Sequence, residues 1–333
     1  MNEQLNSFCD KLCASREAIK KQMYWETDYN TLSIISAFLH VSEKKEVNVE
    51  KYKACKKILK NKVSAFSELR GIARGIVLTK MELSDNPEAF IEGTLETYRK
   101  LRDLHKFTAS PYMVLAAMTI YEKAGAYEVD TYIDKLEYIY SRLKSVHPLL
   151  ISDSDRAILA LIAVSDLSVE QALEKIEANY NAFKSMHFSK DSIHSMAQAL
   201  STSEKSPEVL KEEITSLFQG LKNAGKPIDK RYGSVTLSLL TFLNLPRETI
   251  ISEITDVDNY LKDKSGFKWY NHGPKFRRMF DEMVVMLANN KNNEIMDVAM
   301  ASSMSYLITI MILIMCSASS SAAAAAAASS GSN

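Results

Sequence analysis

The sequence predicts an all-α protein built from helical hairpins of about 40 residues, stacked as a HEAT-like α-solenoid. Glycine and proline are few, 10 and 7 in 333 residues, which favours long helices over a turn-rich β architecture. An apolar position recurs at nearly constant spacing, and signals for helix starts recur in phase with it. An irregular multi-helix bundle is the alternative architecture.

The recurring apolar position serves as an anchor for the alignment of the repeats. The anchors, spaced by 42, 40, 38 and 40 residues, are Leu101, Leu143, Phe183, Leu221 and Leu261. The residues three places before them, four of which are aromatic, are Tyr98, Tyr140, Tyr180, Phe218 and Asp258. Positions three and ten before an anchor lie on the same helix face as the anchor. Each repeat is therefore expected to contain one long amphipathic helix.

The start of each long helix is marked fourteen residues before its anchor. The residues at this position are Pro87, Val129, Val169, Pro207 and Arg247. Two of them follow Asn86 and Ser206, which places a capping residue before a proline at the first helical position. Ser168 with Gln171 forms the pattern of a capping box.

A shorter apolar segment rich in small residues precedes each long helix. The segments are LRGIARGIVL, PYMVLAAMTIY, RAILALIAV, IHSMAQAL and GSVTLSLLTFL. A pair of one short and one long helix cannot bury its apolar face alone, but stacked neighbours can.

The repeats divide the chain into four parts. Residues 1–65 form an N-terminal cap with a weak first repeat, and 66–270 form five repeats. Residues 271–297 form a closing helix, and 298–333 form an uncharged tail.

The composition of the chain argues against some classes of protein function. The 41 basic and 41 acidic side chains balance, which argues against a nucleic-acid-binding protein, since such a protein needs a basic surface. Four cysteines and a polar, charged start that lacks a signal peptide indicate the reducing cytoplasm. We find no phosphate-binding glycine loop, no GxSxG, HExxH or CxxC motif and no zinc spacing, so the sequence predicts no catalytic residues, no metal and no cofactor.

Three histidines recur four residues after the anchors. His105, His147 and His187 fall just past the expected ends of long helices, and Pro148 prevents its helix from continuing. Equivalent points on stacked helices lie about 8–10 Å apart or more. These positions are therefore expected to end helices rather than to share a metal ion.

The segment from Ser265 to Phe280 is the least repeat-like part of the core. It combines aromatic, polar and basic side chains around a Gly-Pro turn, and the candidate binding residues are Trp269, Tyr270, His272, Lys275, Arg277 and Arg278. Loops with tryptophan and arginine are common binding surfaces, and arginine binds phosphate or carboxylate in bidentate fashion. The structural alternative is a junction whose aromatic side chains pack on the last repeat.

The tail carries no charged residue from Val298 to Asn333. Its first 19 residues, 298–316, could just cross a bilayer, which would make a C-terminal membrane anchor. Small and hydroxyl residues dilute the apolar run, however, and its continuous core is only Tyr306 to Cys316. A helix that packs on a partner or on the end of the stack is the other interpretation.

The segment FSELRGIARGIVLTKM, the divergent helical repeats and the uncharged ending rich in Met, Ala and Ser together resemble the Domain of Unknown Function 4003 family. The resemblance covers nearly the whole chain and implies a bacterial, mainly α-helical protein, without an assigned activity or functional residues.

From the repeat architecture we expect a scaffold that binds a protein or peptide partner. The alternatives are a helical enzyme with a pocket near Trp269–Arg278 and a tail-anchored membrane adaptor.

Overall fold

The computed structural model describes residues 1–24, 29–104, 110–124, 128–230 and 233–289. Within these ranges every regular element is helical and no strand occurs, which confirms the all-α prediction. The predicted tail, 298–333, and His105 lie outside the described residues, as does the side chain of His272.

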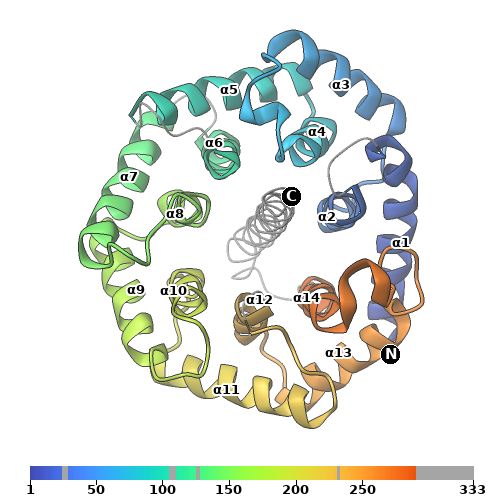
Figure 1. The fold of residues 1–333 in the computed structure, drawn as a ribbon, viewed down its shortest axis with the longest axis vertical. Helices are drawn as coiled ribbons and strands as arrows, with labels where there is room; N and C mark the ends of the chain where they lie inside the picture. The colour runs from blue at the N-terminus through green and yellow to red at the C-terminus, as the bar shows by residue number, and fades with distance from the viewer. Residues whose placement is uncertain (25–28, 105–109, 125–127, 231–232, 290–333) are drawn as a thin grey trace, which may run out of the picture.

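The helices form two concentric layers around a common centre (Figure 1). The outer layer contains the odd-numbered helices, which are α1 (Glu3–Met23), α3 (Val49–Lys62), α5 (Pro87–Leu104), α7 (Val129–Val146), α9 (Val169–Phe183), α11 (Pro207–Asn223) and α13 (Arg247–Leu261). The inner layer contains α2 (Tyr29–Ser42), α4 (Arg74–Leu83), α6 (Pro111–Ala124), α8 (Asp155–Ala163), α10 (Lys190–Ala199), α12 (Gly233–Leu239) and α14 (Trp269–Asn289). Two short 3₁₀ helices, η1 (Glu68–Arg70) and η2 (Leu240–Phe242), flank inner helices.

The predicted starts of the five long helices are confirmed. α5, α7, α9, α11 and α13 begin at the five residues that stand fourteen places before the anchors. The Asn86 side chain accepts a hydrogen bond from the Ala89 amide at 3.1 Å, and Ser168 forms the complete capping box with Gln171. All five anchors are buried, which places the predicted apolar face of each outer helix against the inner layer.

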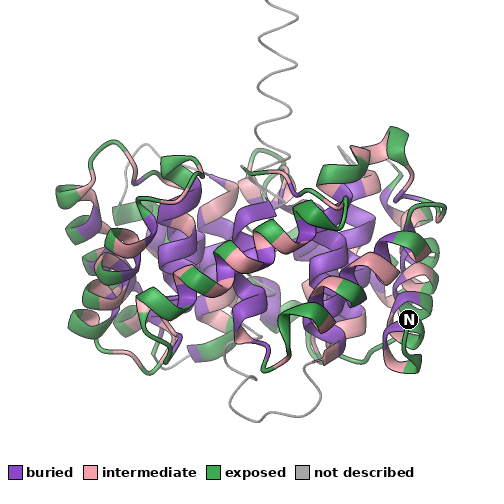
Figure 2. Cartoon of the chain, turned by 90° about the horizontal axis from the view of Figure 1, so that it is seen from below, coloured by how far each residue is buried: buried purple, intermediate pink, exposed green. Residues whose placement is uncertain are grey.

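The two layers differ in how they are buried. All nine residues of α8 and all seven of α12 are buried, whereas the outer helices show alternating buried and exposed faces (Figure 2). A helix that is apolar on most sides needs cover on most sides. The short apolar segments of the sequence therefore form the inner layer because the long amphipathic helices cover them from outside.

The residues three places before three of the anchors, Tyr140, Phe218 and Asp258, contact basic side chains that follow in the chain. The Arg156 guanidinium lies 3.8 Å from the ring centroid of Tyr140, and the Lys230 ammonium lies 5.5 Å from that of Phe218. In α13 the corresponding residue is Asp258 instead of an aromatic residue, and it pairs with Arg277 and Arg278 of α14. The departure from the aromatic pattern thus occurs in the helix that precedes α14.

The first and last described helices, α1 and α14, lie side by side, so that the layers close into a ring (Figure 1). α1 contacts both α13 and α14. The amino terminus of Met1 lies 2.7 Å from the Asp256 carboxylate, and the Asn2 side chain donates a hydrogen bond to Glu253 at 2.9 Å. These polar contacts at the rim add to the buried apolar residues of α1 to hold the ring closed.

Candidate functional site

The predicted binding segment begins with a pair of exposed aromatic residues. Trp269 is 75% and Tyr270 is 63% exposed, and their ring centroids are 6.0 Å apart. Gly273 has a φ of 71°, which breaks the helix before Pro274 and lets the chain turn into the second part of α14. Lys275, in this second part, is exposed as well.

The two arginines of the same segment point into the protein instead. Arg277 and Arg278 are 5% and 3% exposed and are held by Asp258, with N–O distances of 2.8 Å for each. Burial by itself would raise the pKa of Asp258, but hydrogen bonds from Lys226 and both arginines outweigh it and hold the pKa below its usual range. The structure therefore does not gather the six predicted residues on one surface, and their role in binding stays a prediction.

Next to this cluster two buried carboxyl groups lack full pairing. Burial raises the pKa of Asp281 well above its ordinary value and that of Glu282 to about 8. The hydroxyl of Thr236 is within hydrogen-bonding reach of both the Gly233 carbonyl and Glu282. The Thr236 hydroxyl has one hydrogen, which it can donate to the Gly233 carbonyl. A protonated Glu282 can then donate its own hydrogen to the Thr236 oxygen. The contacts are thus consistent with a neutral Glu282.

The structure also brings together residues around His147 that the sequence did not connect. His147 ends α7 as predicted, and its Nε2 lies 2.7 Å from Glu177. Its ring centroid lies 5.4 Å from that of His194, whose pKa is lowered to about 4 by burial and by His147. Among the described residues no three His, Cys, Asp or Glu side chains meet as a metal site would require.

A cleft lies where the first and last described helices meet. Its volume is about 750 Å³, and it is lined by α1, by the connection between α2 and α3, and by the end of α14. Apolar lining comes from Phe8, Val41, Val47 and Leu287. The Phe8 ring also packs against Phe38 of α2, with a centroid distance of 6.4 Å.

Charged residues of the same cleft are mainly basic. Lys11, Lys44 and Lys45 line it, with Glu46 as the acidic residue among the described lining. The cleft therefore joins an apolar wall to an excess of positive charge, which suits an anionic ligand that also carries an apolar group.

The backbone at the end of α2 places two of these lysines. Lys44 has a φ of 55°, in the left-handed region, and the Lys45 amide donates to the His40 carbonyl at 2.9 Å. This is the hydrogen-bond pattern that ends many helices, at a position where glycine is usual. Residues strained in this way cluster at functional sites. None of the residues predicted to bind a ligand lines this cleft, and its local signal in the sequence is the lysine pair after the apolar segment 32–41.

The family comparison covers most of the chain. A family model matches residues 16–314, and the family is described as a protein of unknown function, DUF4003. No curated protein and no solved structure matches the chain. Of the helices in the described ranges, none combines the length and apolar character that a membrane span requires. The predicted span, 298–316, lies outside those ranges.

Proposed function

The chain belongs to the DUF4003 family of proteins of unknown function, and we propose that it is a scaffold that binds a protein or peptide partner in the cleft between α1, the α2–α3 connection and α14. In this proposal its hairpins are repeats of about 40 residues, a HEAT-like solenoid closed into a ring. The three cysteines of the described residues, Cys9, Cys13 and Cys55, are free, which accords with the reducing cytoplasm of a bacterium.

The observation that carries this proposal is the size and lining of the cleft. A volume of about 750 Å³ falls within the usual range for ligand sites, about 300–1,000 Å³. The α1 lining runs from Gln4 to Ala18, which at about 1.5 Å per residue spans roughly 21 Å. An extended peptide of about six residues, at 3.3 Å each, has the same length. We therefore expect a short linear segment as ligand.

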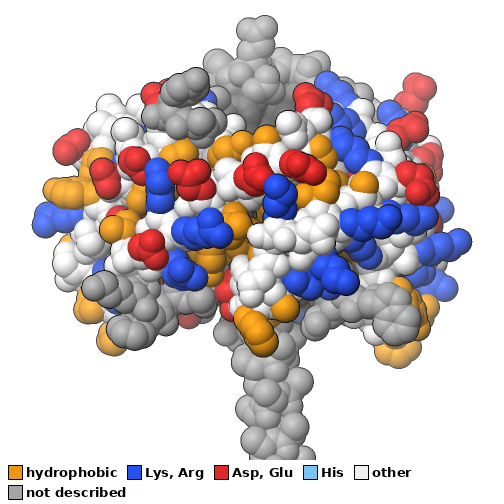
Figure 3. Space-filling model, turned by 90° about the horizontal axis from the view of Figure 1, so that it is seen from above, with side chains coloured by type: hydrophobic (Ala, Val, Ile, Leu, Met, Phe, Trp, Pro, Cys, Tyr) orange, Lys and Arg blue, Asp and Glu red, His pale blue; other side chains and the backbone are white. Residues whose placement is uncertain are grey.

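The charges of the cleft specify the peptide further. With three lysines and one glutamate in the lining, an acidic segment would gain electrostatic attraction, and its apolar side chain would cover Phe8 and Leu287. On the side of the ring that Figure 3 shows, acidic and basic side chains are interspersed over much of the surface, and basic ones gather toward one edge. A smaller pocket of about 190 Å³ is also basic, with Lys56, Lys57, Lys60, Arg70 and Arg74 in its described lining, but its apolar lining is Leu59 alone. The cleft differs from it in its size and in its apolar wall.

The first test is binding of labelled peptides to the full chain, measured by fluorescence anisotropy. We expect hexapeptides that combine Asp or Glu with Leu or Phe to bind, and the same peptides with Lys in place of the acids not to bind. The double variant Lys11→Glu/Lys44→Glu should bind about tenfold more weakly, since reversing two surface charges changes the binding free energy by about 1–2 kcal/mol. The matched control Lys123→Glu/Lys184→Glu changes exposed lysines on α6 and after α9, and should bind like the wild type.

Lys44 allows a second test that separates binding from folding. Replacing it by glycine removes a left-handed non-glycine residue, which should stabilise the fold by about 1 kcal/mol. The same change removes one cleft ammonium group and should weaken binding of the acidic peptides. If Lys44→Gly raises stability and leaves binding unchanged, or if no acidic peptide binds the wild type, the cleft is not the binding site.

A further inference from the structure

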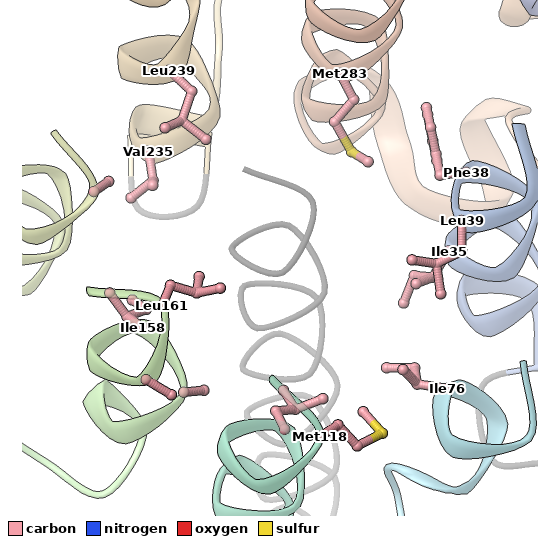
Figure 4. Close-up of a cluster of buried hydrophobic side chains, with 14 of the residues drawn as sticks. Ile35, Phe38, Leu39, Ile76, Met118, Ile158, Leu161, Val235, Leu239 and Met283 are labelled. Atoms are coloured by element: carbon pink, nitrogen blue, oxygen red, sulfur yellow. The ribbon is translucent and has the colours of Figure 1, made fainter. Parts of the chain in front are cut away.

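The apolar side chains of the inner layer do not suit a charged ligand. Figure 4 shows buried side chains of this layer, among them Leu161 of α8, Val235 of α12 and Met283 of α14. Hydrocarbon and thioether groups donate no hydrogen bond to an anion, and a charge beside them would lose its hydration without replacement. A site for a charged small molecule is therefore expected at the edges of the ring, where exposed connections join the helices (Figure 2).

A separate pocket, which we call the rim pocket, lies among connections that follow the outer helices. Its volume is about 610 Å³, within the usual range for ligand sites, about 300–1,000 Å³. Its described lining comes from the chain after α9, the last turns of α11, the α11–α12 connection and the second part of α14. This lining shares no residue with that of the cleft in the proposed function, so the two sites can be tested separately.

The rim pocket has an excess of positive charge. Lys222 of α11, Lys230 of the α11–α12 connection and Lys275 of α14 line it, and the other ionisable residues of its described lining are His187 and Asp229. In the part of the chain that the structure describes, none of the three lysines forms an ion pair. Three ammonium groups around one hollow repel one another and attract an anion.

The turn that ends α11 leaves the Lys222 side chain available to a ligand. Gly225 has a φ of 71°, the Lys226 amide donates to the Leu221 carbonyl at 2.8 Å, and the Gly225 amide donates to the Lys222 carbonyl at 3.1 Å. Backbone amides thus satisfy these last carbonyls of the helix, and no lysine side chain is required to cap them. The Lys226 ammonium is instead paired with Asp258, so it does not belong to the pocket.

The α11–α12 connection is held in place on both sides of its charged residues. Ile228 is 4% exposed and anchors the connection in the core. The Ser192 hydroxyl of α10 donates a hydrogen bond to the Lys230 carbonyl at 3.3 Å. The backbone that carries the Lys230 ammonium is therefore fixed relative to α10 and α11.

An apolar wall stands beside the lysines. Phe218 and Pro227 line the pocket, and the Phe218 ring packs edge-on against Phe188 with a centroid distance of 5.2 Å. The Lys230 ammonium lies 5.5 Å from the centroid of the Phe218 ring. An aromatic surface and a cation thus lie next to each other in one pocket.

We propose that the rim pocket binds a mononucleotide, which joins a phosphate group to a flat aromatic base. Its phosphate would lie among Lys222, Lys230 and Lys275, because lysine binds phosphate as a point charge. Its base would lie against Phe218 and Pro227, since every base has a face that stacks on an aromatic side chain.

Isothermal titration calorimetry of the full chain tests the proposal, with adenosine 5′-monophosphate as the probe. We expect this nucleotide to bind, and adenosine and inorganic phosphate each to bind at least about tenfold more weakly, because each lacks one of the two groups that the pocket contacts. Absence of nucleotide binding at millimolar concentration would overturn the proposal. Inorganic phosphate that binds as tightly as the nucleotide would also overturn it, because the apolar wall would then contribute nothing.

The lysines are tested by a matched pair of variants. Lys222→Ala/Lys230→Ala should weaken binding of the nucleotide by about tenfold or more, since hydrogen bonds to a charged phosphate are lost. Its thermal melt should stay close to that of the wild type, because both side chains are exposed. The control Lys21→Ala/Lys123→Ala removes two exposed lysines of α1 and α6 and should bind like the wild type. Equal affinities of the two variants would contradict the proposal.

Two further variants separate the apolar wall and the cleft. Phe218→Leu should weaken nucleotide binding by about fivefold or more through lost stacking and leave phosphate binding unchanged. An unchanged nucleotide affinity in this variant would refute the placement of the base. Lys11→Glu/Lys44→Glu should bind the nucleotide like the wild type. If that variant loses the nucleotide, the ligand lies in the cleft and the rim-pocket proposal is wrong, whereas a failure of acidic peptides to bind concerns the proposed function alone.

Discussion

Glu282 gives the sharpest prediction of pH-dependent stability. It is 1% exposed, and burial raises its pKa from the ordinary 4.5 to about 8. Between these values the folded chain keeps a proton that the unfolded chain has lost, so stability falls as pH rises, by about 1.4 kcal/mol per pH unit. Glutamine in its place imitates the neutral acid and can donate to the same Thr236 hydroxyl. Glu282→Gln should therefore remove this loss of stability.

The expected difference in unfolding free energy between Glu282→Gln and the wild type follows from the two pKa values. The variant should be more stable by about 1 kcal/mol at pH 5, about 3 at pH 6.5 and about 4 at pH 8. Urea unfolding followed by circular dichroism at the three pH values measures this, because groups that titrate in both proteins cancel in the difference.

Glu212→Gln, which changes an exposed acid on α11, provides the control and should follow the wild type at every pH. A difference that does not grow with pH, or a variant that is less stable than the wild type at pH 8, would refute the neutral Glu282.

Three further predictions concern other contacts between helices and side chains. Asp258→Asn leaves Arg277 buried without its carboxylate and should cost about 3–5 kcal/mol in urea unfolding. Gly93→Ala would place a Cβ 1.9 Å from the Tyr121 ring, so the ring must move, and a thermal melt should show a loss of about 1–3 kcal/mol. The buried His194 stays neutral to a pKa of about 4, below its ordinary 6.5, so the wild type should lose about 3 kcal/mol relative to His194→Gln between pH 6.5 and 4.

Each of these has its own contradicting result. Glu248→Gln, at an exposed glutamate that pairs with Arg247, is the control for Asp258→Asn. If both substitutions lower the unfolding free energy equally, the buried pair contributes no more to stability than the exposed one. An unchanged melt of Gly93→Ala would mean that α5 and α6 are not packed as described. Parallel pH profiles of the wild type and His194→Gln would show that the pKa of His194 does not change on folding.

Local signals in the sequence predicted the outer helices correctly. Capping at Asn86, Ser168 and Ser206 depends on contacts within three residues, and the amphipathic period depends on side chains of one helix. Short stretches of sequence therefore determine both the helix caps and the amphipathic pattern. The end of α7 at His147 was predicted for the same reason.

The candidate site depended on contacts that no short stretch contains. Arg277 and Arg278 looked like a binding pair beside Trp269, yet the first turn of α14 and its kink at Gly273 send them inward to Asp258. The aromatic pattern, broken at Asp258, was a signal that could have indicated this pairing. The buried Glu282 had no such signal, because its pKa depends on what covers it from other helices.

The sequence by itself determined which segments are helical, where the outer helices begin and which of their faces is buried, since these features arise from interactions within a few residues. Only the tertiary structure decided that the layers close into a ring and that a cleft forms at the junction. Closure joins Asn2 to Glu253, 251 residues away, and the cleft combines α1 with the end of α14. Such contacts depend on how all the helices between α1 and α14 pack on one another, and no short stretch of sequence contains that information.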